Sequence, residues 1–303
     1  MFFRNAPCFG KEGGIIMEYT KTYQNQCYDE ERALYGVRNV LVEHCVFDGP
    51  ADGESALKES KQIMVRDCQF MLRYPFWHVE HGMLEDCIMS EGCRAALWYD
   101  QDVVIKNCSL GGIKALRECE DIQFHNCNIV SPEFSWRCGD VLVKDCSLTS
   151  EYPFFESKNL TVEDSTIKGK YSFQYVENAV ISDCVLDTKD AFWHSRNVTV
   201  TDSIVKGEYL GWYAENLKFV RCKIIGTQPL CYAKGLVLED CTMEGTDLAF
   251  EYSDVTADII GDIVSVKNPL SGRIRANDIG EVVRGDSVRG EGDCEIITGF
   301  RRA

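Results

Sequence analysis

The chain has 303 residues, of which 45% are hydrophobic and 26% charged, and this composition excludes a disordered, collagen-like or proline-rich chain. Its formal net charge of −16 disfavours binding to nucleic acid and to anionic membranes, and no apolar stretch is long enough to span a membrane. The chain carries 16 cysteines but no Cys-x-x-Cys pair and no recognisable export signal at its start. We therefore expect a cytoplasmic protein with reduced thiols, no bound metal and no cofactor.

Residues 1–36 are expected to form an N-terminal cap. Cys8 and Cys27 keep the cysteine spacing of the later sequence, but its flanking apolar alternation is missing, and an acidic run stands at Asp29-Glu30-Glu31. The open end of a sheet needs such a cover, because its unpaired backbone groups would otherwise recruit another strand. If the cap leaves that edge open, homo-oligomerisation is an alternative.

From residue 37 to residue 252 the sequence repeats with a period of about 19 residues, which is typical of a solenoid. Around most marks of this repeat the pattern is apolar-x-apolar-x-Asp/Asn-Cys-x-apolar. In a solenoid each coil buries its apolar side against its neighbours. The marks of the repeat are Cys45, Cys68, Cys87, Cys108, Cys127, Cys146, Ser165, Cys184, Ser203, Cys222 and Cys241.

The repeat must be distinguished from a leucine-rich repeat, which Leu217-x-Phe219-x-x-Cys222 would also fit. A leucine-rich repeat needs a helical segment, whereas the rest of each coil here is aromatic and favours strands, as in Leu210-Gly211-Trp212-Tyr213-Ala214. We therefore predict an all-β fold, a right-handed parallel β-helix of about 10–11 coils in one domain of residues 1–303. Residues 253–303, where the repeat fails, are expected to form the C-terminal cap.

Three further columns follow the same period. Asn159, Asn178, Asn197 and Asn216 lie one repeat apart and predict a hydrogen-bonded asparagine ladder. The cysteine column suits a tight inward position, since thiols are small and apolar. The Asp or Asn before each cysteine is expected to cap a turn, with a calcium-binding strip as the alternative.

All five tryptophans share one register, joined by Phe155 and Phe250. Strict alternation would put this column and the small residues two places later on the inner face. The residues between them would then face outward and form an outer column: Lys58, His78, Tyr99, Glu118, Arg137, Glu156, Tyr175, His194, Tyr213, Tyr232 and Glu251.

The outer column is either an ordinary solvated face or the floor of a groove. Tyrosine and histidine rings suit stacking on sugar rings, and arginine suits an anionic uronate group. Glu118 and Glu156, two coils apart, would have backbones about 10 Å apart, which is compatible with the two carboxyl groups of an inverting glycosidase, whereas a lyase would use a base near Arg137 or Lys58. We expect Glu118, Glu156 and Arg137 to be catalytic, and Lys58, His78, Tyr99, Tyr175, His194, Tyr213, Asp52 and Glu54 to bind substrate, the last two from the acidic loop that lengthens one coil.

The chain resembles a bacterial domain family of unknown function with the pectin-lyase-like β-helix fold. The resemblance covers nearly all of the chain and rests on Glu31-Arg32-Ala33-Leu34-Tyr35-Gly36, Asp52-Gly53-Glu54-Ser55-Ala56-Leu57-Lys58-Glu59-Ser60, Lys189-Asp190-Ala191-Phe192-Trp193, Gly207-Glu208-Tyr209-Leu210-Gly211-Trp212 and Val266-Lys267-Asn268-Pro269. It implies the right-handed single-stranded β-helix but no particular activity. Our hypothesis is a carbohydrate-active protein, a glycosidase or lyase acting on small and uronate-containing saccharides; the alternative is a non-catalytic module that binds a glycan or protein.

Overall fold

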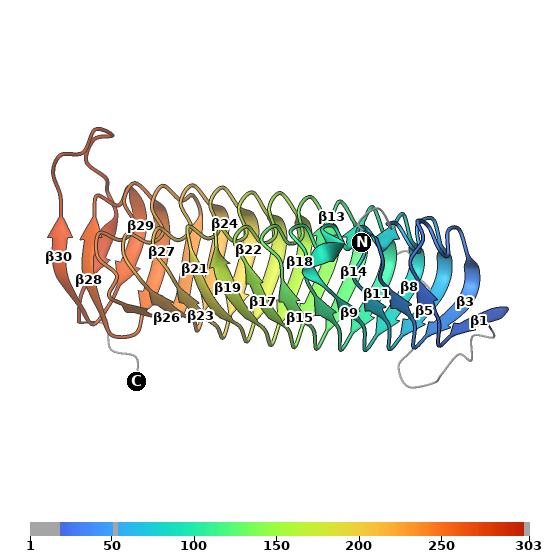
Figure 1. Cartoon of the computed structure of the whole chain (residues 1–303). Coiled ribbons are helices and arrows are strands. Elements are labelled where there is room, and N and C mark those ends of the chain that lie inside the picture. Colours follow the sequence, from blue (N-terminus) through green and yellow to red (C-terminus); the bar gives the residue numbers. More distant parts are fainter. Residues whose placement is uncertain (1–18, 51–53, 300–303) are drawn as a thin grey trace, which may run out of the picture.

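The computed structural model describes residues 19–50 and 54–299, which form an elongated parallel β-solenoid of about 14 turns spaced by about 19 residues (Figure 1). The predicted all-β parallel β-helix is confirmed. The solenoid has more turns than the sequence predicted, because regular strand pairing extends into both segments expected to be caps. At the N-terminal end β1 (Lys21–Gln24) already pairs with β3 (Arg38–Glu43), and near the C-terminal end β27 (Asp254–Ile259) pairs with β29 (Ser271–Arg275).

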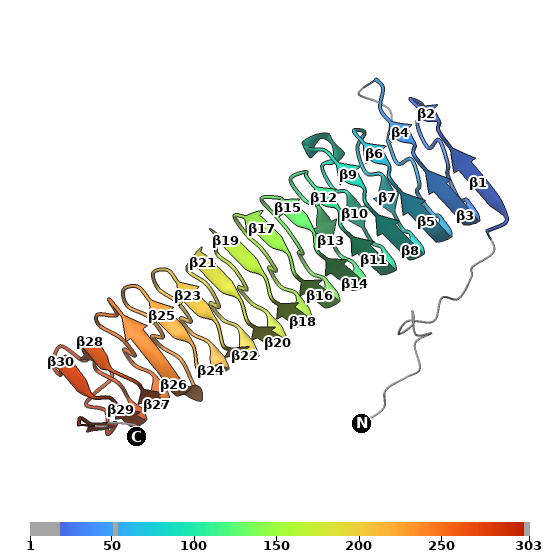
Figure 2. The same ribbon diagram turned by 90° about the horizontal axis from the view of Figure 1, so that it is seen from below.

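Each coil places one strand in the main sheet, in most coils of six residues, and successive strands lie side by side along the solenoid (Figure 2). All pairings are parallel, and most join equivalent positions of successive coils, as Leu142 pairs with Thr161. Besides the four strands above, the main sheet contains β5 (Lys61–Arg66), β8 (Glu80–Glu85), β11 (Gln101–Lys106), β14 (Glu120–His125), β16 (Gly139–Lys144), β18 (Lys158–Glu163), β20 (Glu177–Ser182), β22 (Arg196–Thr201), β24 (Glu215–Val220), β26 (Leu236–Glu244) and β31 (Glu295–Ile297).

A second sheet of shorter strands follows the main sheet across a corner. The long strand β26 runs through both sheets. The second sheet contains β2 (Cys27–Tyr28), β4 (Val46–Phe47), β6 (Gln69–Phe70), β9 (Ile88–Met89), β12 (Ser109–Leu110), β15 (Asn128–Val130), β17 (Ser147–Ser150), β19 (Thr166–Lys170), β21 (Val185–Lys189), β23 (Ile204–Lys206) and β25 (Lys223–Ile225).

A third face closes each coil and returns the chain to the main sheet. It is a regular sheet only in β7 (Phe76–Trp77), β10 (Leu97–Trp98) and β13 (Leu116–Arg117), and elsewhere it consists of tight turns. A two-stranded sheet of β28 (Asp262–Lys267) and β30 (Asp278–Val283) lies at the C-terminal end (Figure 1). One short 3₁₀ helix, η1 (Glu91–Cys93), interrupts the described coils. No helix in the described ranges is long and apolar enough to cross a membrane.

The interior is a continuous column of side chains from all three faces. Phenylalanines stack between successive coils, for example Phe154 on Phe173 with ring centroids 4.8 Å apart and Phe173 on Phe192 at 5.1 Å. These rings are fully buried. Each coil is too short to bury its apolar residues alone, so burial against the coils above and below supplies most of the stabilisation.

The cysteine column is buried, as the sequence predicted, and it also forms a ladder of hydrogen bonds. The amide of Cys127 donates to Sγ of Cys146 at 3.3 Å, and that thiol donates to the carbonyl of Lys144, two residues earlier, at 3.1 Å. Ser165 fills the same place, because its hydroxyl accepts from the amide of Cys146 at 3.0 Å and donates to the carbonyl of Glu163 at 2.6 Å. The column therefore satisfies buried backbone groups where the chain turns between the two sheets.

The residue before each column member turns this corner with a positive φ, such as 54° at Asp145 and 49° at Asp164. Aspartate and asparagine tolerate this left-handed conformation better than most residues, which explains their recurrence. The asparagine column also has positive φ, and its predicted ladder is confirmed: Asn178 donates to Asn159, Asn197 to Asn178 and Asn216 to Asn197 at 3.0–3.1 Å.

We predict that replacing Cys146 by serine leaves stability nearly unchanged, whereas Cys146→Val lowers the free energy of unfolding by about 1–3 kcal/mol. Valine fills the space but cannot accept from the buried amide of Cys127, whereas serine can. Urea unfolding of both variants checks this. Equal losses for the two variants would show that packing alone determines what stands in the column.

Candidate functional site

The tryptophans lie on the outer side of the third face, which corrects the expectation that they belong to the inner face. Phe76 before Trp77 is fully buried, Trp77 is partly exposed, and His78 is exposed. The cause is the backbone of His78, whose φ of 57° breaks the strict alternation of a strand. Two consecutive side chains therefore point outward. The small residues two places after each tryptophan are buried, as predicted.

Two members of the outer column are displaced by one position. The amide of Glu59 bonds to the carbonyl of Trp77 just as the amide of His78 bonds to that of Trp98, so Glu59 rather than Lys58 is in register with His78. Lys58 lies in the tryptophan register, with its Nζ 3.8 Å from the centroid of the Trp77 ring. Glu251 is displaced in the same way, because the amide of Tyr232 donates to its carbonyl. At the second place the step from Tyr232 to Tyr252 is 20 residues instead of 19, whereas Glu59 lies one regular period before His78.

The remaining nine members form one straight strip along the solenoid, which we call the polar–aromatic strip. Every member has a φ between 52° and 60°, and its amide donates to the carbonyl of the coil that follows. The main chain therefore holds the side chains one above another. The strip consists of His78, Tyr99, Glu118, Arg137, Glu156, Tyr175, His194, Tyr213 and Tyr232.

Rings of the strip stack on one another rather than remaining open for a ligand. His78 stacks on Tyr99 at 5.0 Å, and a longer stack runs from Tyr175 through His194 and Tyr213 to Tyr232 with centroids 4.8–5.0 Å apart and planes within 12° of parallel. The expected stacking of sugars on these ring faces is therefore wrong within the stack, because neighbouring rings cover them. The stack exposes ring edges instead; Tyr175 and Tyr213 are 49% and 41% exposed.

The charged centre of the strip lies between its two aromatic parts. Arg137 donates from Nε to Glu156 at 2.7 Å, and this hydrogen bond raises the pKa of Arg137, with Glu118 adding to the effect. Glu118 is 3.4 Å from Arg117, and its interaction raises the pKa of Tyr99. The structure thus brings the three expected catalytic residues onto successive coils. Both carboxylates have an arginine partner, Glu156 at 2.7 Å and Glu118 at 3.4 Å.

Of the two acidic loop residues, the structure describes only Glu54, which does not join the strip. Asp52 lies outside the described residues. Glu54 forms an ion pair with Arg73 at 3.4 Å, and the backbones of the two residues form an isolated parallel β-bridge. This contact is at the corner that leads into the third face.

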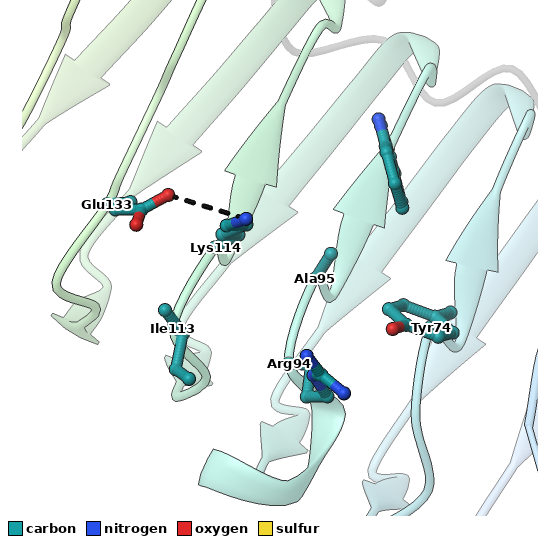
Figure 3. A pocket seen from close by; sticks show the side chains of 7 residues that line it. Tyr74, Arg94, Ala95, Ile113, Lys114 and Glu133 are labelled. Atoms are coloured by element: carbon teal, nitrogen blue, oxygen red, sulfur yellow. Dashed lines mark ion pairs between the residues drawn. The ribbon is translucent and has the colours of Figure 1, made fainter.

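A pocket that the sequence did not indicate opens between that corner and the tryptophan register (Figure 3). Its volume is about 210 Å³, which is room for several water molecules or a small organic ligand. It adjoins the strip, since Trp98 precedes Tyr99. The pocket is lined by Tyr74, Arg94, Ala95, Trp98, Ile113, Lys114 and Glu133.

The thiols and acids do not gather into a metal centre. Within residues 19–50 and 54–299, no group of three or more His, Cys, Asp or Glu side chains is placed to hold a metal ion. The cysteines of these ranges are free, and burial raises the pKa of Cys184 to about 11 and that of Cys93 to about 12. Such thiols are poor nucleophiles, because the thiolate is the reactive form.

Asp100 is a buried carboxyl group in a second column of small residues beside the strip. Its Oδ1 accepts from the amide of Val79 at 2.8 Å, while Oδ2 is buried without a hydrogen bond among the described residues. Desolvation by burial raises the pKa of Asp100 well above its usual range. The thiol of Cys119, one coil on, donates to the carbonyl of Arg117, and a protonated Asp100 would donate in the same way to the carbonyl of Trp98. Asp100 therefore stands where cysteine or serine stands in other coils, and its raised pKa favours the neutral acid.

A family model described as "Protein of unknown function (DUF3737)" matches residues 21–297. The chain belongs to this family. The match spans nearly the whole solenoid, including the strip and the pocket, and it confirms the resemblance to a domain family of unknown function. No curated protein is similar enough to count as a relative of this DUF3737 chain.

Several solved structures share the solenoid at low similarity. The A-module of the mannuronan C-5 epimerase from Azotobacter vinelandii is 9% identical, with 90% of this chain and 86% of that chain covered and a TM-score of 0.33. PfbA, a surface adhesin of Streptococcus pneumoniae, is 10% identical over 79% and 76%, with a TM-score of 0.37. A tailspike protein of the E. coli bacteriophage HK620, in complex with a hexasaccharide, is 9% identical over 86% and 60%, with a TM-score of 0.40. Similarity at this level carries no activity to the DUF3737 chain.

We predict that Asp100→Asn stabilises the protein above about pH 5. The raised pKa of folded Asp100 means that unfolding releases its proton once the pH exceeds the unfolded value of about 4. Wild-type stability should therefore fall as pH rises toward the folded pKa, by up to about 1.4 kcal/mol per pH unit from this group.

Asparagine keeps both hydrogen bonds without a proton to lose, so the wild type and the variant should diverge as pH rises. Free energies of unfolding in urea between about pH 5 and pH 8 check this. Parallel pH profiles for the two proteins would show that Asp100 is charged when folded.

Proposed function

We propose that this protein binds a saccharide along the polar–aromatic strip, through hydrogen bonds from ring edges rather than through ring faces. The observation that carries the proposal is the unbroken stack from Tyr175 to Tyr232, in which Tyr175, His194 and Tyr213 present two hydroxyl groups and a histidine ring in one exposed line. Tyrosine hydroxyls both donate and accept, as do the hydroxyls of a sugar. Coils repeat at about 4.8 Å, so an extended chain of sugars meets a new polar edge at every coil.

The stack is pre-organised for such a ligand. Each ring is held between its neighbours and by a main-chain hydrogen bond, as when the amide of His194 donates to the carbonyl of Trp212. Little side-chain entropy remains to be lost on binding, which improves affinity for a given number of contacts. Arg137, 52% exposed in its side chain, adds a cation that suits an acidic sugar.

Binding fits the charged centre better than catalysis does. A glycosidase needs one carboxyl group that stays protonated until it donates, and such groups are typically buried away from cations. Glu156 instead pairs with Arg137 on an open surface, and Glu118 pairs with Arg117. Cleavage of a glycosidic bond at this centre, by hydrolysis or by a lyase reaction, is the rival function.

We also propose that the protein works in a reducing compartment such as the cytoplasm. The column thiols serve as hydrogen-bond donors and acceptors for the main chain, and oxidation of any one of them would remove its donor. The free state of the described cysteines supports this proposal.

Strip binding predicts that Tyr175→Phe and Tyr213→Phe together weaken oligosaccharide binding by about ten-fold or more without lowering the melting temperature. Phenylalanine keeps each ring in the stack and removes only the hydroxyl edge. A glycan array followed by titration calorimetry on the best ligand measures the change. Tyr35→Phe, an exposed tyrosine at the N-terminal end of the solenoid, is the matched control. Unchanged affinity in the double variant would contradict strip binding.

Catalysis is separated from binding by assaying the best ligands for new reducing ends and for unsaturated products. We expect neither product from the wild type, and we expect Glu156→Gln to alter affinity only. Turnover that Glu118→Gln or Glu156→Gln abolishes, with the fold intact, would replace the binding proposal by an enzymatic function.

A further inference from the structure

The pocket exists because one coil is longer than its neighbours. The step from Cys87 to Cys108 is 21 residues, against 19 residues from Cys127 to Cys146, and the extra residues form η1 at the corner. The next coil fits beneath this bulge with a glycine pair. A Cβ on Gly111 would lie 2.8 Å from the amide nitrogen of Glu91, and Gly112 has a φ of 102°. The bulge holds the corner away from the third face and opens the space between them.

Two indoles near this bulge, those of Trp77 and Trp98, lack the usual hydrogen-bond partner among the described residues, and Trp98 is the one that lines the pocket. In regular coils the Nε1–H group of each tryptophan donates to a carbonyl of the following coil: Trp136 to Tyr152 at 2.8 Å, Trp193 to Tyr209 at 2.6 Å and Trp212 to Gln228 at 2.8 Å. The Nε1 atom of Trp98 is buried but has no hydrogen-bond partner among the described residues. An unsatisfied buried N–H group costs free energy that an acceptor in the pocket would recover.

Cations gather around this indole in a protein of net charge −16. Arg94 and Lys114 line the pocket from neighbouring coils (Figure 3), and Arg117 is paired with Trp98 in the tryptophan register. The opposing charge in the lining is Glu133, whose Oε2 is 3.7 Å from Lys114 and 3.6 Å from Arg117. Both distances are longer than a hydrogen bond. Oε2 of Glu133 and Nη1 of Arg117 are buried and have no hydrogen-bond partner among the described residues.

We propose that this pocket binds the carboxylate end of a small hydroxy acid, such as a sugar acid. The carboxylate accepts from the Trp98 indole and is attracted by Arg94 and Lys114, while a hydroxyl of the same molecule donates to Glu133. A bare anion accepts from the indole and the cations but offers no hydrogen-bond donor to Glu133. A neutral sugar leaves the excess positive charge of the pocket uncompensated. The inference goes beyond saccharide binding on the strip, because a monosaccharide acid tests the pocket alone.

Titration calorimetry with the intact chain and D-glucuronate is the primary test. We expect saturable one-to-one binding that weakens as salt is added, since exposed charges are screened. D-glucose, which has the hydroxyls without the carboxylate, should bind at least about ten-fold more weakly. Inorganic sulfate, which has the charge without the hydroxyl donor, should also bind more weakly than glucuronate.

Variants then locate the binding. Trp98→Phe keeps a ring in the register but removes the N–H donor, and it should weaken glucuronate binding by about ten-fold or more. Lys114→Gln should weaken it several-fold and flatten its salt dependence. Lys234→Gln, at a lysine whose side chain is 78% exposed and lies far along the solenoid, is the matched charge control and should bind like the wild type. Melting temperatures confirm that each variant is folded.

A spectroscopic readout makes the test independent of variant stability. The chain has five tryptophans, so its ¹H–¹⁵N spectrum has five indole signals at most. The signal that disappears in Trp98→Phe should shift on addition of glucuronate, while the signals of the three hydrogen-bonded indoles should not.

Three results would overturn the proposal. They are no binding of glucuronate to the wild type, binding that Trp98→Phe and Lys114→Gln leave unchanged, and sulfate binding as tightly as glucuronate. If glucuronate binds in the pocket but the double variant Tyr175→Phe, Tyr213→Phe binds oligosaccharides as the wild type does, the strip proposal is contradicted and the pocket proposal is retained. If glucuronate does not bind but the double variant weakens oligosaccharide binding, only the strip proposal is retained.

Discussion

The structure depends on the hydrogen bonds that join each coil to the next at residues with left-handed backbone conformation. These residues turn the corners of every coil and also form the polar–aromatic strip on the third face. Left-handed backbone costs a non-glycine residue roughly 1–2 kcal/mol. At the corners aspartate and asparagine reduce that cost. On the strip the residues are tyrosine, histidine, glutamate and arginine, so the compensation must come from contacts between coils: stacked rings and the ion pair of Arg137 with Glu156.

This constraint explains both what the sequence predicted and what it did not. The period of the cysteine column was enough to identify the solenoid, because identical positions of successive coils meet the same surroundings. The orientation of the tryptophans was mispredicted, since alternation assumes extended backbone and the φ of His78 is 57°. Histidine is enriched in the left-handed conformation, but the tyrosines, glutamates and arginine at the other strip positions are not, so the residue types of the column do not reveal the change. Glu251 was displaced for a simpler reason: the 19-residue period was carried from Tyr232 through a coil of 20 residues. Lys58 was placed one residue too early, since Glu59 lies one regular period before His78.

The stacking that stabilises the strip also limits its chemistry. A ring buried between two others cannot offer its face to a sugar, so the aromatic composition that suggested carbohydrate stacking instead supports the backbone. A ligand can still reach the exposed edges of the rings, whose polar groups are spaced by the distance between successive coils. The charged centre follows the same logic, because Arg137 stabilises two neighbouring coils by pairing with Glu156 and is also the exposed cation of the strip.

A regular solenoid repeats one surface, and a repeated surface is a ridge or a furrow but not a closed site. A concave site with unlike walls needs a coil that departs from its neighbours, as the coil from Cys87 to Cys108 does. The consequences are local: the corner bulges at η1, Gly111 and Gly112 accommodate it, and Trp77 and Trp98 lack the carbonyl partner that the other three tryptophans bond. Lys114 and Glu133 lie one regular period apart on successive coils, and the longer coil adds Arg94, whose carbonyl accepts from the amide of Lys114. The irregular step that interrupts the repeat is therefore the feature that gives this solenoid an enclosed polar site.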